Sequence, residues 1–158
     1  MIIIDGHNLL HSIVKVDHDS EPISDIQLCW VISRYFKAVN ETGEIVFDGT
    51  GPRDKSGFDN IAHLEVFFAG LGTDADSVIE NKIKASTAPK RLTIVSSDRR
   101  LRNSARSRKA TSVKSEVFWG NLQKQLRRKK PVREPEAKRM GLSESETTQW
   151  LEFFGIEQ

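Results

Sequence analysis

Short apolar segments recur along this chain and alternate with segments of helical periodicity. Runs of this length, rich in Ile, Val and Phe, are typical of buried strands. The predicted strands span residues 1–5, 44–48, 63–68, 91–96 and 112–117. The predicted helices span residues 24–39, 74–85, 99–108, 118–130 and 143–154. Alternation of this kind predicts an α/β fold, in which helices cover both faces of a mainly parallel sheet of about five strands.

The length of 158 residues fits one domain of ordinary size. We expect this domain to span residues 1–130. A basic linker that contains two prolines would follow over residues 131–142, and an amphipathic helix over residues 143–158 would pack back on the domain.

Composition excludes several classes of protein. With Cys29 as the only cysteine, an internal disulfide is impossible. No apolar run approaches the ~18–20 residues of a membrane span, and the N-terminus has no basic region typical of a signal peptide. We therefore expect a soluble cytoplasmic protein with no membrane partner. Nucleotide-binding glycine motifs are also absent.

Acidic side chains gather where the predicted strands end. Asp5 and Asp48 end the first two strands, and Asp98 follows the fourth. Asp74 and Asp76 open the helix after the third strand. The carboxyl ends of parallel strands meet at one edge of a sheet, where open α/β sheets place their sites. Carboxylates crowded there repel one another unless a cation neutralises them, and oxygen ligands of this kind select Mg²⁺ or Mn²⁺.

Other polar residues near these ends have an ordinary structural explanation as well as a functional one. The amide of Asn8 would hold a carboxylate or a scissile phosphate, or would only stabilise a turn. The four histidines lack metal-ligand spacing, and surface or packing roles are favoured for them. Phe118 and Trp119 would stack bases, although core packing is the more common role of such residues.

The net charge of +2 hides a strong asymmetry. Residues 99–139 contain 15 Lys and Arg but only 3 Glu, whereas the rest of the chain has 9 basic and 19 acidic residues. A basic sector beside an acidic body indicates a polyanionic partner. The candidate contacts to nucleic-acid phosphates form two clusters, Arg99, Arg100, Arg102 and Arg106 in the first and Lys124, Arg127 and Arg128 in the second.

Four motifs occur in a fixed order along the predicted strands: IIIDGHN, VFDG, TDADSVIE and IVSSD. In this order they resemble the NYN domain, a PIN-like nuclease fold, with spacing most similar to the YacP-like branch of small endoribonucleases. The resemblance covers about residues 1–120. It implies a three-layer Rossmann-like sheet, an acidic pocket that binds Mg²⁺ or Mn²⁺, and cleavage of single-stranded RNA. The active-site residues that it implies are Asp5, Asn8, Asp48, Asp76 and Asp98.

The mechanism that follows is metal-assisted hydrolysis of a phosphodiester bond. Asp5, Asp76 and Asp98 would hold the metal, with Asp74 as a further candidate ligand. Asp48 would complete the pocket or position the attacking water, and Asn8 would orient a ligand. The first basic cluster would hold RNA on either side of the scissile bond, and the second would extend this track or bind ribosomal RNA.

Two alternatives stay open at this stage. In the first alternative, the chain is a non-catalytic RNA- or ribosome-binding module that keeps the acids for structure. In the second, it is a structure-specific DNA nuclease with the same metal chemistry. A phosphatase of the aspartyl-phosphate type is disfavoured, because DGHNL lacks the second Asp of its DxDx[TV] motif.

Overall fold

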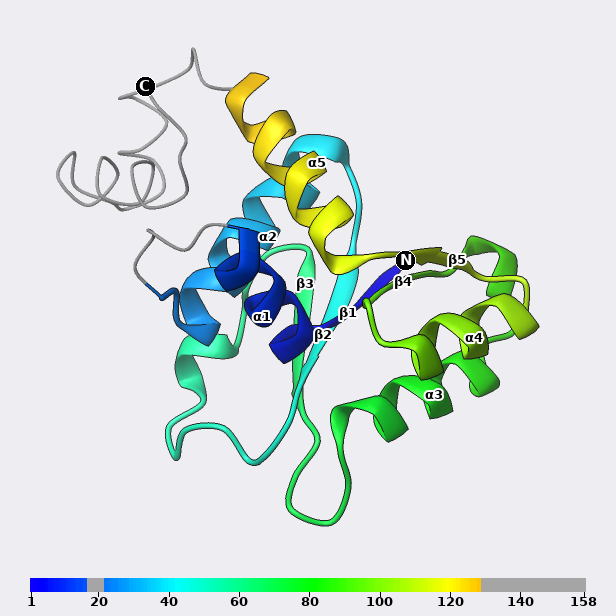
Figure 1. Cartoon of the computed structure of the whole chain (residues 1–158). Coiled ribbons are helices and arrows are strands. Elements are labelled where there is room, and N and C mark those ends of the chain that lie inside the picture. The colour runs from blue at the N-terminus through cyan, green and yellow to red at the C-terminus, as the bar shows by residue number, and fades with distance from the viewer. Residues whose placement is uncertain (17–21, 129–158) are drawn as a thin grey trace, which may run out of the picture.

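A five-stranded parallel sheet forms the centre of the part of the chain that the computed structural model describes, residues 1–16 and 22–128 (Figure 1). Its strands are β1 (Ile2–Asp5), β2 (Gly43–Phe47), β3 (Leu64–Phe68), β4 (Thr93–Val95) and β5 (Thr111–Val113). Their order is β3-β2-β1-β4-β5, and every neighbouring pair is parallel. The α/β class and the parallel sheet predicted from the sequence are confirmed.

Helices cover both faces of the sheet and give three layers (Figure 1). The α-helices are α1 (Gly6–Val16), α2 (Asp25–Val39), α3 (Ala75–Ala85), α4 (Arg99–Ser107) and α5 (Ser115–Arg128). Two short 3₁₀ turns, η1 (Ser56–Phe58) and η2 (Pro89–Arg91), lie in the connections. Helices α1, α2 and α5 pack on one face, and α3 and α4 pack on the other.

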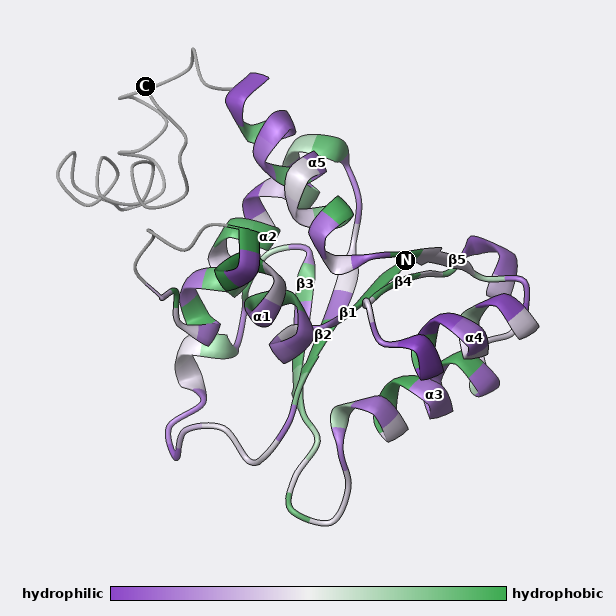
Figure 2. Ribbon diagram, viewed as in Figure 1, coloured by the Kyte–Doolittle hydropathy of each residue, from purple (hydrophilic) through white to green (hydrophobic). Residues whose placement is uncertain are grey.

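The alternation of side chains along each strand divides the core in two. Successive residues of a strand point to opposite faces, so Ile4 packs under α1, α2 and α5 whereas Ile3 packs under α3 and α4. In Figure 2 the strands are hydrophobic, and they lie between helices that carry both hydrophilic and hydrophobic residues. Phe118 and Trp119 are buried in the first of these cores, which confirms the packing role.

The order of the strands reverses between β1 and β4. From β1 the chain builds outward to β2 and β3, then returns to the other side of β1 for β4 and β5. The connections after β1 and β4 therefore leave the sheet in opposite directions, and a crevice opens at the carboxyl ends of these two strands. Asp5 is the last residue of β1, and the segment Ser96 to Asp98 follows β4.

Two local elements differ from the prediction. No helix was predicted directly after Asp5, whereas the segment there is the 11-residue helix α1, with Asn8 in its first turn. The strand predicted over 112–117 ends at Val113, and α5 begins at Ser115. Ser115 is buried and its backbone N–H donates to Ser97 Oγ, which anchors the helix start there.

The C-terminal predictions, the linker over 131–142 and the helix over 143–158, lie outside the described residues. None of the helices within residues 1–16 and 22–128 has the length and apolar content needed to cross a membrane.

Candidate active site

A pocket of about 530 Å³ lies where β1 and β4 end. Five carboxylic acids line it: Asp5, Asp48, Asp76, Asp98 and Glu116. Helix α1 contributes a second set of lining residues: His7, Asn8, His11, Ser12, Lys15 and Val16. Ser97 completes the wall. The structure therefore brings together all five of the residues predicted as catalytic.

Asp5 is the most deeply placed acid of the pocket. Its side chain is only 5% exposed. Burial, and then the charge of Asp76, raise the pKa of Asp5 from 3.8 to about 6. Two hydrogen bonds act in the opposite direction, one from Ser96 Oγ at 3.1 Å and one from the backbone of Asn8. Asp5 therefore keeps its proton to a higher pH than an ordinary aspartate does.

The other aspartates reach the pocket from three different elements. Asp48 follows β2. Its Oδ1 accepts the backbone N–H of Ala75, the first residue of α3, at 2.8 Å. Asp76 lies in the first turn of α3. Burial first, and then Asp98 and Asp74, raise the pKa of Asp76. These mutual effects indicate that the carboxylates lie close enough to repel one another.

Asp98 caps the helix that follows it. Its Oδ1 accepts the backbone N–H of Leu101 at 3.2 Å, and its own N–H donates to Ser96 Oγ at 3.1 Å. Because Ser96 also donates to Asp5, one hydroxyl links the end of β1 to the start of α4. The second carboxylate oxygen of Asp98 has no hydrogen-bond partner among the described residues, so it is available to a ligand.

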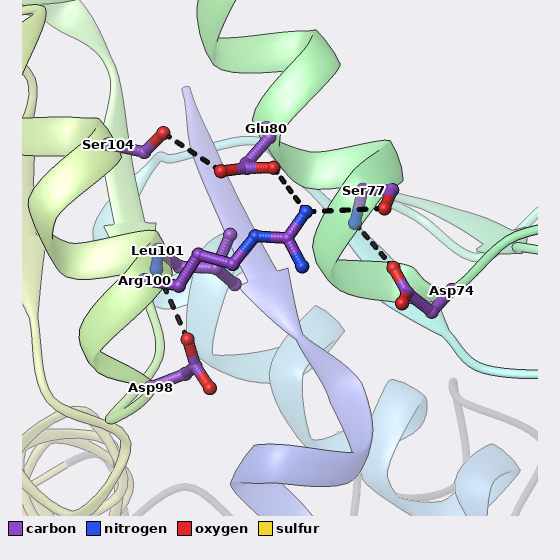
Figure 3. Close-up of polar contacts among 7 residues, drawn as sticks. All are labelled: Asp74, Ser77, Glu80, Asp98, Arg100, Leu101 and Ser104. Carbon is purple, nitrogen blue, oxygen red and sulfur yellow. Dashed lines mark hydrogen bonds and ion pairs between the residues drawn. The ribbon is translucent and has the colours of Figure 1, made fainter.

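Asp74 has a different role from Asp76. It is the N-cap of α3, and its Oδ1 accepts the backbone N–H of Ser77 at 2.7 Å. This hydrogen bond lowers the pKa of Asp74, which is exposed. Figure 3 shows Asp74 with Ser77 at the start of α3. Asp74 does not line the pocket, so the structure does not bring this candidate ligand together with the other four aspartates.

The side chain of Asn8 has a defined orientation. Its Oδ1 accepts the backbone N–H of Ser97 at 2.9 Å and the hydroxyl of Ser115 at 2.7 Å. Both acceptor positions are therefore occupied, and the Nδ2 group, which can only donate, is left for the pocket. A donor at this position suits a phosphate oxygen or a carboxylate. It does not suit a metal ion.

Sequence reasoning missed the pocket face of α1 and also Glu116. Asn8, His11, Ser12 and Lys15 recur at intervals of three and four residues, which places them on one face of a helix. Had residues 6–16 been predicted as a helix, this spacing would have identified the polar face from the sequence. Glu116 accepts a hydrogen bond from Ser97 Oγ at 2.7 Å. It carried no such signal, because α5 was predicted to begin at residue 118.

His7 also lines the pocket, where a surface or packing role had been favoured. Its Nδ1 accepts the backbone N–H of Asp48 at 3.3 Å, and its Nε2 lies 3.7 Å from a carboxylate oxygen of Asp25. The ring also packs against Phe47, with the centroids 5.3 Å apart. His7 thereby joins the start of α1 to the connection after β2.

The arginines of α4 lie beside the pocket without lining it. Arg100 forms an ion pair with Glu80 and a hydrogen bond with Ser77, both on α3 (Figure 3). Arg102 donates from Nε to Ser112 Oγ at 3.4 Å. The other predicted RNA-binding residues are exposed to solvent: Arg99 and Arg106 of α4, and Lys124, Arg127 and Arg128 of α5.

The donor set of the pocket suits a hard divalent cation. Carboxylate oxygens are the ligands that Mg²⁺ and Mn²⁺ prefer, and a cation would relieve the repulsion that raises the pKa values of Asp5 and Asp76. In residues 1–16 and 22–128, no three His, Cys, Asp or Glu side chains are grouped as a ready metal cage. Mg²⁺, however, is commonly held by one or two carboxylates, with water and substrate phosphate as its other ligands.

The five-stranded parallel sheet, with an acidic pocket where β1 and β4 end, matches the PIN-like class of α/β folds. The family model of the YacP-like NYN domain matches residues 2–153, and the chain belongs to this family of PIN-like nucleases.

Solved structures agree with this fold. The crystal structure of Rae1 (YacP) from Bacillus subtilis is similar, with a TM-score of 0.67 and 17% identity over 98% of this chain and 92% of that one. A mutant of the same protein gives a TM-score of 0.62 and 16% identity, over 97% and 91% of the two chains. At this identity the likeness shows a shared fold. The comparison with curated proteins gives no match.

Proposed function

We propose that this protein is a metal-dependent endoribonuclease that hydrolyses phosphodiester bonds of single-stranded RNA. The observation that carries the proposal is the convergence of Asp5, Asp48, Asp76 and Asp98 on one pocket. These residues come from four separate segments of the chain, and the fold brings all four to one pocket. Membership of a nuclease family supports the same conclusion.

Asp5, Asp76 and Asp98 would hold a Mg²⁺ or Mn²⁺ ion. Asp74 is left out of this set, because its carboxylate caps α3 outside the pocket. A bound divalent ion supplies a water of lowered pKa and offsets the charge that develops on the phosphoryl group. Asp5 would bind the metal most strongly when it is ionised. Release of its proton on metal binding would therefore weaken the net affinity for the metal.

The remaining polar groups would orient the reactants. Asn8 Nδ2 donates to a non-bridging oxygen of the scissile phosphate, because its Oδ1 is already bound to Ser97 and Ser115. Asp48 Oδ2, which lies 3.6 Å from Nδ1 of His7, would position the attacking water, while Oδ1 stays bound to the N–H of Ala75. The water oxygen would bond to phosphorus while its proton passes to the Asp48 carboxylate, and the phosphorus–oxygen bond to the leaving oxygen would break, with that oxygen taking up a proton from solvent.

The exposed arginines and lysines would bind the RNA backbone. Arg99 and Arg106 are exposed on α4 and free to contact phosphates, whereas Arg100 and Arg102 first have to leave their partners Glu80 and Ser112. Lys124, Arg127 and Arg128 at the end of α5 would extend this track or contact ribosomal RNA. Contacts of this kind are sequence-independent and weaken steeply with salt.

One observation favours the alternative of a non-catalytic RNA- or ribosome-binding module. Asp48 and Asp98 each accept a backbone N–H at the start of a helix, so these two acids have a structural role as well. The two functions differ in what an active-site substitution does. In the nuclease, Asp5→Ala abolishes cutting and leaves RNA binding in place, whereas the binding module never cuts at all.

The experiment that tests the proposal is cleavage of an end-labelled single-stranded RNA by the full chain. Parallel reactions contain Mg²⁺, Mn²⁺ or EDTA, and binding is measured on the same RNA in EDTA. We expect cutting with either metal and none with EDTA. Binding without cutting, also when translating ribosomes are added, would favour the binding module.

A further inference from the structure

Two chemically different sets of side chains line the pocket. Four aspartates come from the end of β1, from the segments after β2 and β4, and from α3, whereas a second set comes from α1 and from Glu116 of α5. Besides His7, the basic side chains that line this pocket are His11 and Lys15, both on α1. The aspartates offer ligands for a metal, and the basic side chains of α1 offer donors for an anion.

His11 and Lys15 are placed at regular steps from Asn8. The rise of an α-helix is 1.5 Å per residue, so their Cα atoms lie about 4.5 and 10.5 Å further along the axis. All three side chains share the pocket face of α1. A strand of RNA whose scissile phosphate lies at Asn8 would therefore carry its next phosphate group along this helix.

Neither His11 nor Lys15 has a hydrogen-bond or ion-pair partner in the described part of the chain. The charge of Lys15 does reach Glu116, where Lys114 and Lys15 are among the causes that lower the pKa of that acid. No salt bridge closer than 4.0 Å joins Lys15 to Glu116, however. By contrast, Arg100 of α4 is already paired with Glu80.

We propose that His11 and Lys15 form a binding subsite for the phosphate that neighbours the scissile phosphate of a single-stranded RNA. This inference rests on the proposed function. The Lys15 ammonium pairs with the phosphate, and an imidazole N–H of His11 donates to one of its oxygens. The RNA backbone then runs along α1 from the aspartates toward Lys15.

The test compares Lys15→Gln with Lys37→Gln. Both lysines are exposed, and each lies in the last turn of its helix, α1 or α2. The two substitutions therefore remove the same charge from the last turn of a helix, and of the two only Lys15 lines the pocket. Lys15→Arg restores the charge, and the Tm of every variant is measured to confirm folding.

Affinity for a short fluorescent single-stranded RNA is measured in EDTA over a range of salt concentrations, and kcat and KM are measured with Mg²⁺. We expect Lys15→Gln to raise Kd and KM about 3- to 10-fold with little change in kcat, as loss of uniform binding does. The salt dependence of log Kd should weaken by about 0.7, the value for one lost phosphate contact on a single strand.

Lys37→Gln should match the wild type in all of these measurements, and Lys15→Arg should recover most of the loss. Equal Kd, KM and salt dependence for Lys15→Gln and Lys37→Gln would overturn the subsite while leaving the nuclease in place. Failure of the wild type itself to bind or cut the RNA would overturn the proposed function, and the subsite with it.

Discussion

The backbone N–H of Ser97 donates to Oδ1 of Asn8 at 2.9 Å, across 89 residues of sequence. This hydrogen bond joins the first turn of α1 to the segment that follows β4. The bond lies between β1 and β4, where the strand order reverses and the crevice opens. It therefore connects the two segments that line the crevice on either side. The hydroxyl of Ser115 donates to the same oxygen and brings the start of α5 to this junction.

Substitutions at Asn8 should separate its structural role from its chemical role. Asn8→Ala removes the acceptor of both hydrogen bonds, and we expect the free energy of unfolding to fall by about 2–3 kcal/mol. Asn8→Asp keeps the acceptor but loses the Nδ2 donor, so folding should persist while kcat falls about 100-fold. Urea denaturation and RNA cleavage check the two effects. Equal loss of stability in both variants would contradict this division of roles.

The raised pKa of Asp5 predicts a stability that depends on pH. Between pH 3.8 and about 6 the folded state binds more protons at Asp5 than the unfolded state does. The stability that protonated Asp5 contributes is therefore lost as the pH rises through this window, and the loss is about 3 kcal/mol.

Asp5→Asn removes this penalty, because the amide carries no charge and still accepts from Ser96. In EDTA the variant should be more stable than the wild type at pH 8, with a difference that shrinks toward zero at pH 4. Urea denaturation at both pH values gives the free energies. A difference that is the same at both would show that the charge of Asp5 is not the cause.

Metal binding should appear as a rise in Tm. An ion that binds only the folded state stabilises it by mass action, so Mn²⁺ or Mg²⁺ should raise the Tm of the wild type at pH 7.5. The rise should be smaller at pH 5, where Asp5 holds its proton, and smaller in Asp5→Asn. Thermal unfolding with and without metal measures it, with Ca²⁺ and high NaCl as controls for general ionic effects. No rise for the wild type would contradict a metal site in this pocket.

Gly6 lies where β1 turns into α1, and a side chain does not fit there. A Cβ atom on Gly6 would lie 2.4 Å from Cδ1 of Phe47, a fully buried ring. Gly6→Ala should therefore lower the free energy of unfolding by about 1–3 kcal/mol. Gly120→Ala is the matched control, because Gly120 lies in α5 with open space around its Cβ position. This change should stabilise the protein by up to about 1 kcal/mol, and a similar effect of both substitutions would exclude the clash with Phe47.

The sheet was predictable because the strands repeat a simple pattern. Runs such as IIID and EIVFD are apolar, short and closed by an acid, and the parallel topology then fixes where those acids meet. The placement of Asp5, Asp48 and Asp98 at one edge of the sheet follows from the order of the elements alone, without knowledge of any distance between side chains.

Helix α1 could not be recognised as easily. Gly6 and Asn8 are typical of turns, yet Gly6 serves a close approach to Phe47, and Asn8 binds residues about 90 and 107 positions away. Tertiary contacts of this kind leave no local pattern. Asp74 and Asp76 show the same limit, because two acids at neighbouring positions of one helix end differ only in which way each side chain points. One of them caps the helix, and the other enters the pocket.

The comparison of Asp98→Asn with Asp74→Asn tests the central claim most directly. Each aspartate is the N-cap of its helix, and Asn caps about as well as Asp, so both variants should fold and lose one negative charge. Only Asp98 lines the pocket. We predict that Asp98→Asn loses metal-dependent cleavage of single-stranded RNA by at least about 100-fold while still binding the RNA, and that Asp74→Asn cuts like the wild type. Full activity of Asp98→Asn beside an active wild type would contradict the assignment of this pocket as the nuclease site.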